Sequence, residues 1–348
     1  MHGGMRVCGH GGSASDAQLP VTSGISGRRV LVTGAGGFIG SHLVQLLVAE
    51  GAEVRAFVHY NSRGDAAHLE GLNLPGVEVV SGEIQDPFSV RAAVEGCSTV
   101  FHLAALIGIP YSYVAPQSYV ATNISGTLNV LEAARSADVQ RVVHTSTSET
   151  YGTARYTPID EAHPLQGQSP YSATKIGADK LAESYWRSFG LPVTTLRPFN
   201  TFGPRQSLRA VIPTIIAQAL GDGPIRLGSR TPVRDFTFVE DTARAFLAAG
   251  TSDATVGKTL NAGSGKGITI GELADLILEM LGVEREIVTD DDRVRPEASE
   301  VFELLADASR LRELCGWTPQ VPLRDGLART AEWVERNMAV LKPGVYNV

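Results

Sequence analysis

A glycine-rich segment that follows a short apolar run constrains the fold of this chain more than any other feature of its sequence. Residues 30–33 read VLVT, residues 34–40 read GAGGFIG, and leucines then recur at helical spacing. A strand, a glycine turn and a helix in this order form the phosphate-binding turn of a dinucleotide-binding sheet. The glycines permit the tight turn, the approach of a pyrophosphate and the close packing of helix on strand. We therefore expect dinucleotide contacts from Gly34, Gly37, Phe38, Ile39 and Gly40.

Short β-branched runs alternate with helical stretches as far as residue 197. The expected strands occupy residues 30–33, 54–58, 77–80, 99–103, 141–146 and 193–197. Helices are expected between them at about 38–50, 87–95, 117–137 and 170–189. The last helix has Ser169 as its cap and Pro170 in its first turn. This alternation predicts an α/β fold, a doubly wound parallel sheet of the Rossmann type with helices on both faces.

Beyond residue 197 the alternation gives way to mixed segments, with helices expected near 210–220, 236–249, 270–282, 307–315 and 323–338. We interpret this region as a smaller substrate-binding lobe that is interleaved with the sheet. Residues 1–26 are rich in Gly and Ser, lack a sustained apolar segment and are expected to form a disordered tail. The expected domains are a dinucleotide-binding domain at 27–198, with sheet-completing segments from about 233–262, and mainly the substrate-binding lobe at 199–348.

The charge balance narrows the range of partners. The chain has 30 Lys and Arg against 37 Asp and Glu, a net charge of −7, with no block of like charge. We expect neither nucleic acid nor a membrane as partner, since no basic cluster and no apolar run of ~20 residues is present. Cys8, Cys97 and Cys315 are widely spaced and form no C-x-x-C, which favours a reducing, cytoplasmic location. His2 and His10 flank Cys8 in the tail without a fixed geometry, so we expect no metal site.

The second expected strand ends without the acidic residue that often binds the adenosine ribose. That position holds His59, which Tyr60, Asn61, Ser62 and Arg63 follow. Asn61 or Ser62 could hydrogen-bond a free 2′-hydroxyl, whereas Arg63 could pair with a 2′-phosphate, so both NAD and NADP are compatible with the sequence. Further contacts with adenine and ribose are expected after the third and fourth strands, from Glu83, Ile84, Leu103, Ala104 and Ala105.

A tyrosine and a lysine four residues apart, Tyr171 and Lys175, lie on one face of the helix that Ser169 caps. A nearby ammonium favours the charged form of a phenol, so we expect the pKa of Tyr171 to be lowered toward the range of a general base. The fifth strand ends in HTSTSETYG at residues 144–152, at the edge where doubly wound sheets bind ligands. The Thr147 hydroxyl is expected to share a substrate oxygen with Tyr171.

From about residue 28 to at least residue 330, the sequence resembles extended short-chain dehydrogenases/reductases of the nucleotide-sugar epimerase/dehydratase family. The similar segments are the glycine turn 34–40, HLAA at 102–105, STSETYG at 146–152, YSATK at 171–175, RPFNTFGPR at 197–205, RDF at 234–236 and NAGSG at 261–265. The resemblance implies a nucleotide-diphosphate sugar as substrate. It also implies a tightly bound, recycled NAD or NADP that takes a hydride from sugar C4, with Tyr171 and Lys175 beside it. A homodimer that pairs the helices around 117–137 and 170–189 is a further implication.

Glu149 favours one branch of this family. The resemblance implies that 4,6-dehydratases use a glutamate here to remove the C5 proton, whereas 4-epimerases usually carry a small residue. The STSE run is similar to that of GDP-mannose 4,6-dehydratases. Ser148 then stands where other dehydratases have an aspartic acid that protonates the leaving hydroxyl, so Glu149 or Ser148 supplies that proton. We predict a 4,6-dehydratase that oxidises C4, loses water across C5 and C6 and returns the hydride to C6, giving a 4-keto-6-deoxy sugar. Its catalytic residues are Thr147, Ser148, Glu149, Tyr171 and Lys175.

Three alternatives were weighed against this interpretation. The second candidate activity is that of a 4-epimerase. The third is that of a UDP-glucuronate decarboxylase, since such enzymes have a similar STSE run. The loop at 106–113, LIGIPYSY, contains no Arg or Lys for a sugar carboxylate, which weighs against the decarboxylase. This loop looks most like that of dehydratases acting on N-acetylhexosamine nucleotides. A regulator that only senses the dinucleotide would not need the intact Thr147, Glu149, Tyr171 and Lys175 set.

The substrate itself is expected to meet arginines and asparagines of the second half of the chain. Guanidinium groups match phosphate oxygens, so Arg205, Arg234 and Arg295 are the expected clamps for the diphosphate. Asn200 and Asn261 are expected to contact sugar or phosphate.

Overall fold

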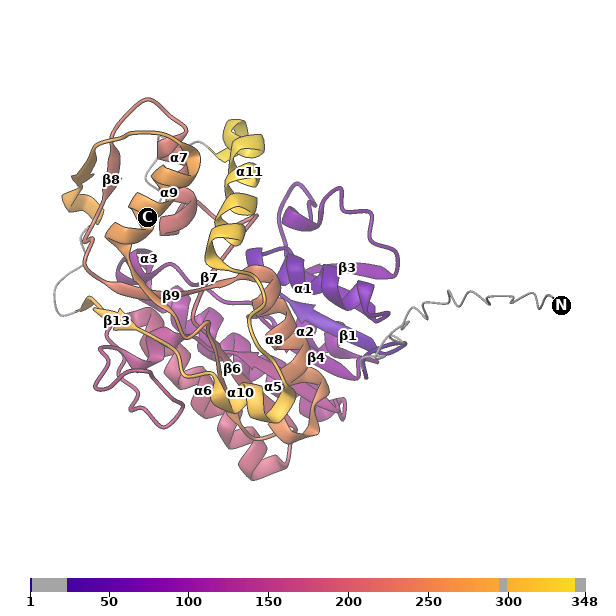
Figure 1. Cartoon of the computed structure of the whole chain (residues 1–348). Helices are drawn as coiled ribbons and strands as arrows, with labels where there is room; N and C mark the ends of the chain where they lie inside the picture. Colours follow the sequence, from indigo (N-terminus) through magenta and orange to yellow (C-terminus); the bar gives the residue numbers. More distant parts are fainter. Residues whose placement is uncertain (2–23, 294–298, 342–348) are drawn as a thin grey trace.

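The computed structural model describes Met1 and residues 24–293 and 299–341, and its centre is a seven-stranded parallel sheet (Figure 1). The strand order is β10-β6-β5-β4-β1-β2-β3, so the chain moves outward in one direction from β1 and then restarts at β4 on its other side. Ligands of such sheets bind where the order reverses, at the carboxyl ends of β1 and β4. The strands are β1 Arg29–Thr33, β2 Glu53–His59, β3 Val77–Gly82, β4 Thr99–His102, β5 Arg141–Thr145, β6 Val193–Pro198 and β10 Thr259–Ala262. This architecture confirms the predicted doubly wound α/β fold.

Helices cover both faces of the sheet, which explains why the strands read as nearly continuous apolar runs. Successive residues of β1 point to opposite faces: Val30 and Val32 belong to one apolar cluster, and Leu31 belongs to the other. The first cluster includes side chains of α1 Phe38–Ala49, α8 Val239–Thr251 and α10 Ser309–Cys315. The second includes side chains of α2 Pro87–Val94, α5 Gly126–Ser136 and α6 Pro170–Phe189.

The second lobe has its own core and two small sheets, seen above the main sheet on the left of Figure 1. Its strands are β7 Asn200–Phe202, β8 Ile225–Leu227, β9 Val233–Phe238, β11 Gly267–Thr269, β12 Ile287–Thr289 and β13 Glu303–Leu304. Its helices are α7 Val211–Ala219, α9 Ile270–Leu281 and α11 Leu323–Leu341. Of the segment 233–262, α8 packs on the main sheet and β10 pairs with β6, whereas β9 pairs with β7, β11 and β13 in the smaller sheet. The strand of this segment that completes the main sheet is β10, and β9 belongs to the smaller sheet.

The expected tail at 1–26 lies mostly outside the described residues, but its end requires a correction. The side chain of Ile25 is 1% exposed and belongs to the same cluster as Val30 and Leu47. The backbone N–H of Gly27 donates to the carbonyl of Gly51. Residues 24–26 are therefore part of the folded domain, because burial of one isoleucine and pairing of the adjacent backbone offset the entropy of ordering them.

The helical region expected at 117–137 is interrupted. It consists of α4 Pro116–Tyr119, a π-helical turn at Val120–Ser125, and α5. Such turns are rare and often occur at functional sites. Here the turn carries Asn123, whose buried amide pairs with both the N–H and the carbonyl of Leu106 and with the hydroxyl of Thr174. Asn123 therefore fixes the loop after β4 against α6.

Helix α6 begins and ends where the sequence predicts. The hydroxyl of Ser169 accepts from the N–H of Ser172, and Ser172 completes a reciprocal capping box. Pro170 occupies the first turn, and Gly190 ends the helix in the left-handed conformation with φ of 68°. The short helix α3 Ile109–Val114 packs against α6. Within residues 24–293 and 299–341, the helices are too short or too polar to cross a membrane.

Replacing Ser169 with alanine removes the cap of α6. We expect the free energy of unfolding to fall by about 1 kcal/mol, since an orphan N–H in the first turn loses its acceptor. Urea denaturation of wild type and variant measures this difference. Ser184→Ala, which changes an exposed serine within the same helix, is the matched control and should change the stability by less than about 0.5 kcal/mol. Equal losses in both variants would contradict a capping role.

Candidate active site

The glycine turn lies against the segment that follows β4. Gly34 has φ of 70°, and a Cβ added to it would lie 2.9 Å from the backbone nitrogen of Ala104. A Cβ at Gly40 would collide with the carbonyl oxygen of Gly34, so both positions require glycine. Helix α1 begins after Gly37 with no side-chain cap and no acidic residue in its first turn. Its first N–H groups, which include those of Phe38 and Ile39, are suited to a phosphate.

The buried hydroxyl of Thr33 and the imidazole of His102, neither of which was predicted as a site residue, hold the segment after β4 beside this turn. The Thr33 Oγ1 accepts hydrogen bonds from the backbone N–H groups of Leu103 and Ala104, each at 3.1 Å. The same hydroxyl bonds to Nδ1 of His102 at 2.8 Å, and Nε2 of His102 bonds to Thr127 at 3.0 Å. Leu103 and Ala104 are therefore held beside the glycine turn.

The end of β2 carries charges that pair with one another. His59 Nε2 lies 3.2 Å from a carboxylate oxygen of Glu83, which follows β3, and Arg63 Nε lies 3.1 Å from Asp65. Asn61 accepts from the N–H groups of Arg63 and Asp65 and donates to Asp65, which shapes this loop. Because Asp65 balances the charge of Arg63, the loop offers less attraction to a 2′-phosphate and is better suited to NAD.

Two other residues expected at the ribose differ in burial. Ser62 is exposed in the loop after β2. The side chain of Ile84 is 7% exposed and packs closely on Gly126 of α5. A Cβ added to Gly126 would lie 2.9 Å from Cγ2 of Ile84. Ile84 therefore contributes to the core as well as to the edge of the expected cofactor site.

Tyr171, Thr147 and Glu149 meet at the carboxyl end of β5. The Thr147 side chain hydrogen-bonds to Tyr171 and also accepts from the N–H of Glu149 at 3.3 Å. Burial raises the pKa of the Tyr171 phenol, the bond from Thr147 opposes this, and the nearby charge of Glu149 adds to it. The predicted lowering of the Tyr171 pKa is therefore corrected, because desolvation exceeds the effect of the surrounding donors. Ser148, between Thr147 and Glu149, is 3% exposed.

Glu149 differs from the other buried carboxylates of this region. Its side chain is half-buried, and among the residues that the structure describes it has no hydrogen-bond or ion-pair partner. It lies close enough to Tyr171 for its charge to act on the phenol. A carboxylate that is partly desolvated and unpaired is suited to take up a proton from a ligand beside it.

Lys175 is fully enclosed and donates from Nζ to the carbonyl oxygen of Thr145 at 2.5 Å. Burial lowers the pKa of its ammonium to about 8, and the charge of Asp179 opposes this shift. Asp179, four residues further along α6, was not predicted as a site residue although its spacing places it on the face of Tyr171 and Lys175. Its carboxylate accepts from His144 at 3.1 Å, from Ser146 at 2.7 Å and from Arg197 at 2.8 Å.

The expected substrate residues are engaged to different degrees. Asn200 lies on β7 with a buried side-chain oxygen that has no hydrogen-bond partner among the described residues, so it can accept from a ligand donor. Asn261 is 0% exposed, and its amide pairs with Tyr151 and with the backbone carbonyls of Ile159 and Asp307, which indicates a structural role. Arg295 lies outside the described residues.

Two of the expected diphosphate clamps have protein partners. Arg234 is 7% exposed and pairs with Glu300 at 3.1 Å. Arg205 has φ of 72° and donates to the Ser41 hydroxyl of α1 at 3.1 Å, which ties its loop to the dinucleotide-binding domain. These contacts hold the second lobe in place, so both arginines have a structural role.

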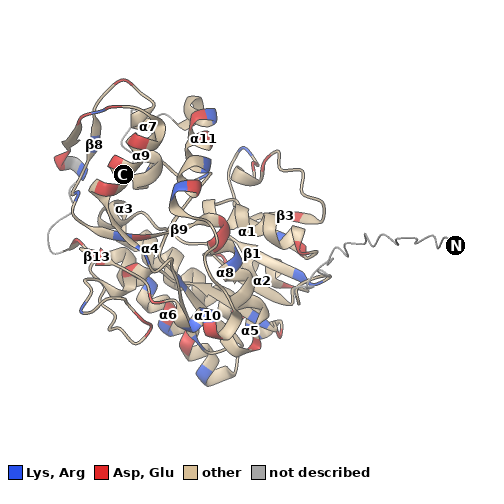
Figure 2. Cartoon of the chain, viewed as in Figure 1, with Lys and Arg blue, Asp and Glu red and all other residues tan. Residues whose placement is uncertain are grey.

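Metal and cysteine chemistry find no support in the described residues. No group of three or more His, Cys, Asp or Glu side chains that could hold a metal ion occurs there. Cys97 is buried and Cys315 is half-buried, and both are free thiols. Acidic and basic residues are interspersed along the ribbon in Figure 2 and do not gather in one part of it. The residues that the structure brings together are instead those of an oxidoreductase-type fold: a dinucleotide turn beside a Tyr, Lys, Thr and Glu set.

Comparison with known proteins agrees with this class of site. The family model described as GDP-mannose 4,6 dehydratase matches residues 31–330. A UDP-glucose 4-epimerase of Mycolicibacterium smegmatis is 35% identical over 312 residues, which cover 88% of this chain and 98% of that protein. A dTDP-glucose 4,6-dehydratase of an Actinoplanes species is 33% identical over 322 residues, with coverage of 89% and 98%. The dTDP-glucose 4,6-dehydratase DesIV of Streptomyces venezuelae, solved as a double mutant with NAD bound, superposes with a TM-score of 0.82 at 31% identity, covering 90% of this chain and 99% of that one.

The chain therefore belongs to the GDP-mannose 4,6 dehydratase family of NAD-dependent nucleotide-sugar epimerases and dehydratases, and it is an enzyme of that family. The resemblance found in the sequence is confirmed. The relatives include both 4,6-dehydratases and 4-epimerases.

Lys175→Met tests the electrostatics of this site through the pH dependence of stability. The ammonium has a pKa of about 8 in the fold, below its usual 10.5, so the unfolded chain binds more protons between these values. The unfolding free energy of wild type should thus rise with pH over this window, by up to about 1.4 kcal/mol per pH unit. We expect the variant to lack this rise, so that the difference between the two proteins changes by about 3 kcal/mol across it.

Chemical denaturation at a series of pH values measures this difference. Lys180→Met changes an exposed lysine of the same helix and should keep the wild-type pH profile. Parallel profiles for wild type and Lys175→Met would contradict a depressed lysine pKa.

Proposed function

We propose that the protein is an NAD-dependent nucleotide-sugar 4,6-dehydratase. The observation that carries this proposal is the half-buried, unpartnered carboxylate of Glu149 beside the hydroxyls of Tyr171 and Thr147. Proton transfer to and from a hydroxyl at C4 needs only Tyr171 and its neighbours. A second proton acceptor at the same place is needed when a carbon-bound proton must also be removed.

The residues at the glycine turn fit the dinucleotide. A Cβ would fill the space at Gly34 and Gly40, and the N–H groups after Gly37 lack a side-chain acceptor. Gly34, Gly37, Gly40 and the segment from Leu103 to Ala105 would hold the cofactor, with His59, Asn61 and Glu83 toward its ribose. When bound, oxidised NAD would accept the hydride from C4, add a positive charge to the site, and return the hydride to C6.

Tyr171 would take the proton of the C4 hydroxyl, with the Thr147 hydroxyl bonded to the same oxygen. The raised pKa of Tyr171 means that the phenol stays protonated until a positive charge lies nearby. The Lys175 ammonium donates to the carbonyl of Thr145 and is attracted by the charge of Asp179. It would stabilise the phenolate once this forms. The chain thus provides a base that is active mainly when cofactor and substrate are both present.

Glu149 would then remove the C5 proton, because the new C4 carbonyl makes it acidic. The 6-hydroxyl leaves as water and needs a proton, which Glu149 has just acquired or Ser148 relays. Ser148, next to Glu149 in the chain, is buried. Return of the hydride to C6 and of a solvent-derived proton to C5 would give a 4-keto-6-deoxy nucleotide sugar and restore the oxidised cofactor.

A 4-epimerase is the second candidate, and the epimerase relative at 35% identity favours it. An epimerase returns the hydride to the opposite face of the C4 carbonyl and does not need a base at C5. The two activities therefore differ in what they require of Glu149.

Glu149→Gln should abolish the release of water and reduce the rate of dehydration by at least about a hundredfold, because general-base catalysis contributes about 10²- to 10⁴-fold. Purified protein is incubated with UDP-, GDP-, dTDP- and CDP-sugars, and the product mass is followed. In D₂O the wild-type product should carry deuterium at C5, and the variant should show no such exchange.

Glu183→Gln, on the exposed side of α6, is the control and should retain wild-type turnover. An unchanged mass with a new sugar isomer would favour the epimerase, and loss of carbon dioxide would favour a decarboxylase. Binding of NAD without turnover of any sugar would favour a dinucleotide-sensing role. Full dehydration by Glu149→Gln would refute the assignment of Glu149.

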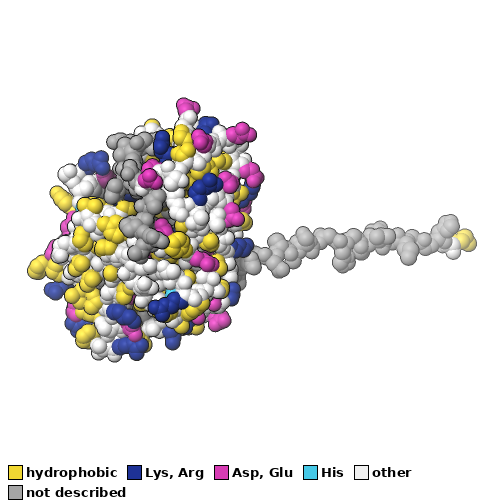
Figure 3. All heavy atoms as spheres, turned by 90° about the vertical axis from the view of Figure 1, so that its left-hand side faces the viewer, with side chains coloured by type: hydrophobic (Ala, Val, Ile, Leu, Met, Phe, Trp, Pro, Cys, Tyr) yellow, Lys and Arg dark blue, Asp and Glu magenta, His cyan; other side chains and the backbone are white. Residues whose placement is uncertain are grey.

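We also propose a homodimer formed through α5 and α6. Leu128 of α5 is 39% exposed, and Trp186 and Phe189 of α6 are 37% and 57% exposed. Yellow apolar side chains also gather on the lower part of the face shown in Figure 3. Leu128→Glu should shift the protein from dimer to monomer in analytical ultracentrifugation, whereas Val340→Glu on α11, also exposed, should not.

A further inference from the structure

A chain of buried polar residues runs from the dinucleotide turn toward helix α6. Its members are Thr33, His102, Thr127 and Asn123, each 1–2% exposed, and consecutive members are hydrogen-bonded. They belong to β1, β4, α5 and the π-helical turn at Val120–Ser125, so the fold brings distant segments together here. His102 is the central member, and the proposed reaction makes no use of its imidazole.

The proton positions at the Thr33 end follow from the hydrogen bonds. A hydroxyl has one proton and two acceptor sites. The backbone N–H groups of Leu103 and Ala104 occupy both acceptor sites of the Thr33 hydroxyl. Its own proton is therefore left for Nδ1 of His102, at 2.8 Å. A ring nitrogen that accepts carries no proton, so the imidazole is neutral and its proton lies on Nε2.

The Thr127 end requires the same form of the ring. The Thr127 hydroxyl donates to the carbonyl of Asn123 at 2.7 Å, so toward His102 it acts as the acceptor and Nε2 acts as the donor. Burial lowers the pKa of His102 well below its usual value, and the charges that His144 and Lys175 can carry lower it further. Hydrogen bonding and desolvation thus favour the same neutral tautomer.

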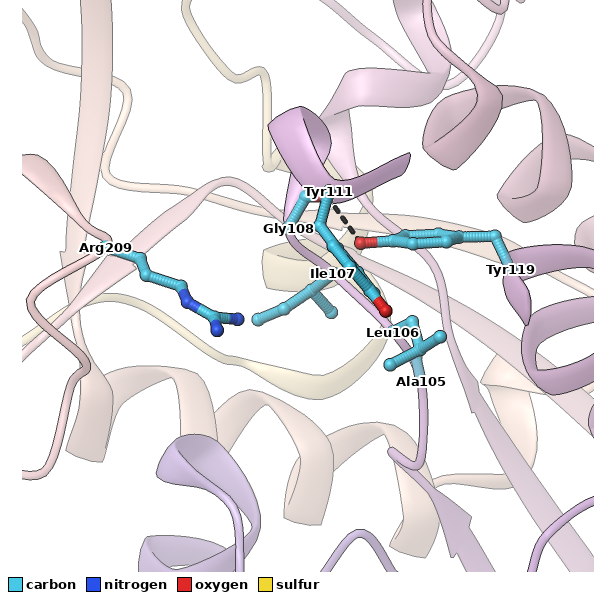
Figure 4. Close-up of a pocket in the computed structure, with 7 residues that line it drawn as sticks. All are labelled: Ala105, Leu106, Ile107, Gly108, Tyr111, Tyr119 and Arg209. Atoms are coloured by element: carbon cyan, nitrogen blue, oxygen red, sulfur yellow. Dashed lines mark hydrogen bonds between the residues drawn. The ribbon is translucent and has the colours of Figure 1, made fainter. Parts of the chain in front are cut away.

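The Asn123 end reaches the substrate side. The Asn123 amide holds both backbone groups of Leu106 and donates to Thr174, whose hydroxyl donates to the carbonyl of Tyr171. Leu106 is part of the wall of a cavity of about 560 Å³, which is lined by residues 105–108, Tyr111, Tyr119 and Arg209 (Figure 4). The chain of hydrogen bonds therefore connects the dinucleotide turn with this cavity and with the backbone of Tyr171.

We propose that His102 is a positioning residue that couples the dinucleotide turn to the cavity loop and to Tyr171. Because the neutral ring accepts on one side and donates on the other, a displacement of either neighbour reorients it and is passed on. Such a coupling acts equally in both directions. The inference requires that the protein binds NAD, but it holds for a dehydratase and for an epimerase alike.

Thr127→Val tests the coupling, because it removes one hydroxyl of the chain without changing the dinucleotide turn. We expect NAD binding to weaken about 5- to 20-fold, since the ring loses its acceptor and no longer orients Thr33. Thr33→Val should weaken NAD binding at least as much. The double variant should bind NAD no more weakly than Thr33→Val alone, because the ring then has no hydroxyl through which to act on the turn. Equilibrium titration of the full-length proteins with NAD measures these affinities.

Thr330→Val is the matched control. Thr330 is buried like Thr127 and also donates to the carbonyl four residues earlier, that of Gly326, but it lies in α11 outside the chain. This variant should lower the melting temperature about as much as Thr127→Val does and keep the wild-type NAD affinity. The proposal would be overturned by unchanged NAD affinity in Thr127→Val, by an equal loss in the control, or by an effect of Thr127→Val that is the same with and without Thr33→Val.

The tautomer is tested on wild type, so this measurement does not depend on the folding of a variant. In the NAD-loaded protein with nitrogen-15 in its imidazoles, His102 is identified by nuclear Overhauser contacts with Thr33 and Thr127. We expect the proton on Nε2 and no titration between about pH 5 and about pH 8. A proton on Nδ1, or a titration in this range, would contradict the proposal. Absence of turnover with every sugar would refute the proposed function and leave these binding and spectroscopic results unaffected.

Discussion

The carboxylate of Asp179 is the buried charge on which the site depends. It accepts hydrogen bonds from His144, Ser146 and Arg197, which belong to two strands of the sheet, while Asp179 itself belongs to α6. Although burial opposes ionisation, these donors and the Arg197 charge keep the pKa of Asp179 below its usual range. A buried charge that loses its partner destabilises a protein by about 3–5 kcal/mol. A shift of α6 along the sheet would separate Asp179 from these partners, so their pairing fixes the position of the helix.

That single position places the reacting groups. Lys175 lies one turn before Asp179, and its ammonium meets the carbonyl of Thr145 at the end of β5. Tyr171 lies one turn earlier again and reaches Thr147 and Glu149 on the loop that follows the same strand. Burial then sets the protonation of each group: it lowers the pKa of Lys175 and raises that of Tyr171. The phenol is therefore protonated in this environment, and a positive charge placed beside it would favour its ionisation.

The second lobe completes the site by bringing distant residues to the same edge. Its position is fixed by contacts such as Arg205 with Ser41 and by the return of the chain through α8 to the main sheet. Arg209 of this lobe lines a cavity together with the loop after β4. A lobe built in this way can vary its sugar and nucleotide contacts without disturbing the dinucleotide turn or the Asp179 cluster.

The sequence alone determined the features that depend on local geometry: the strand, glycine turn and helix at 30–50, the cap at Ser169, and the shared helix face of Tyr171 and Lys175. Spacing and conformational preference act over a few residues, so these could be read directly. Only the tertiary structure decided the surroundings of the arginines, because Arg234 pairs with Glu300 and Arg209 lines a cavity with the loop at 106–108 through the approach of distant segments. It also decided that Asn261 is enclosed and that the Tyr171 pKa rises, since burial is a property of the packed molecule and not of spacing along the chain.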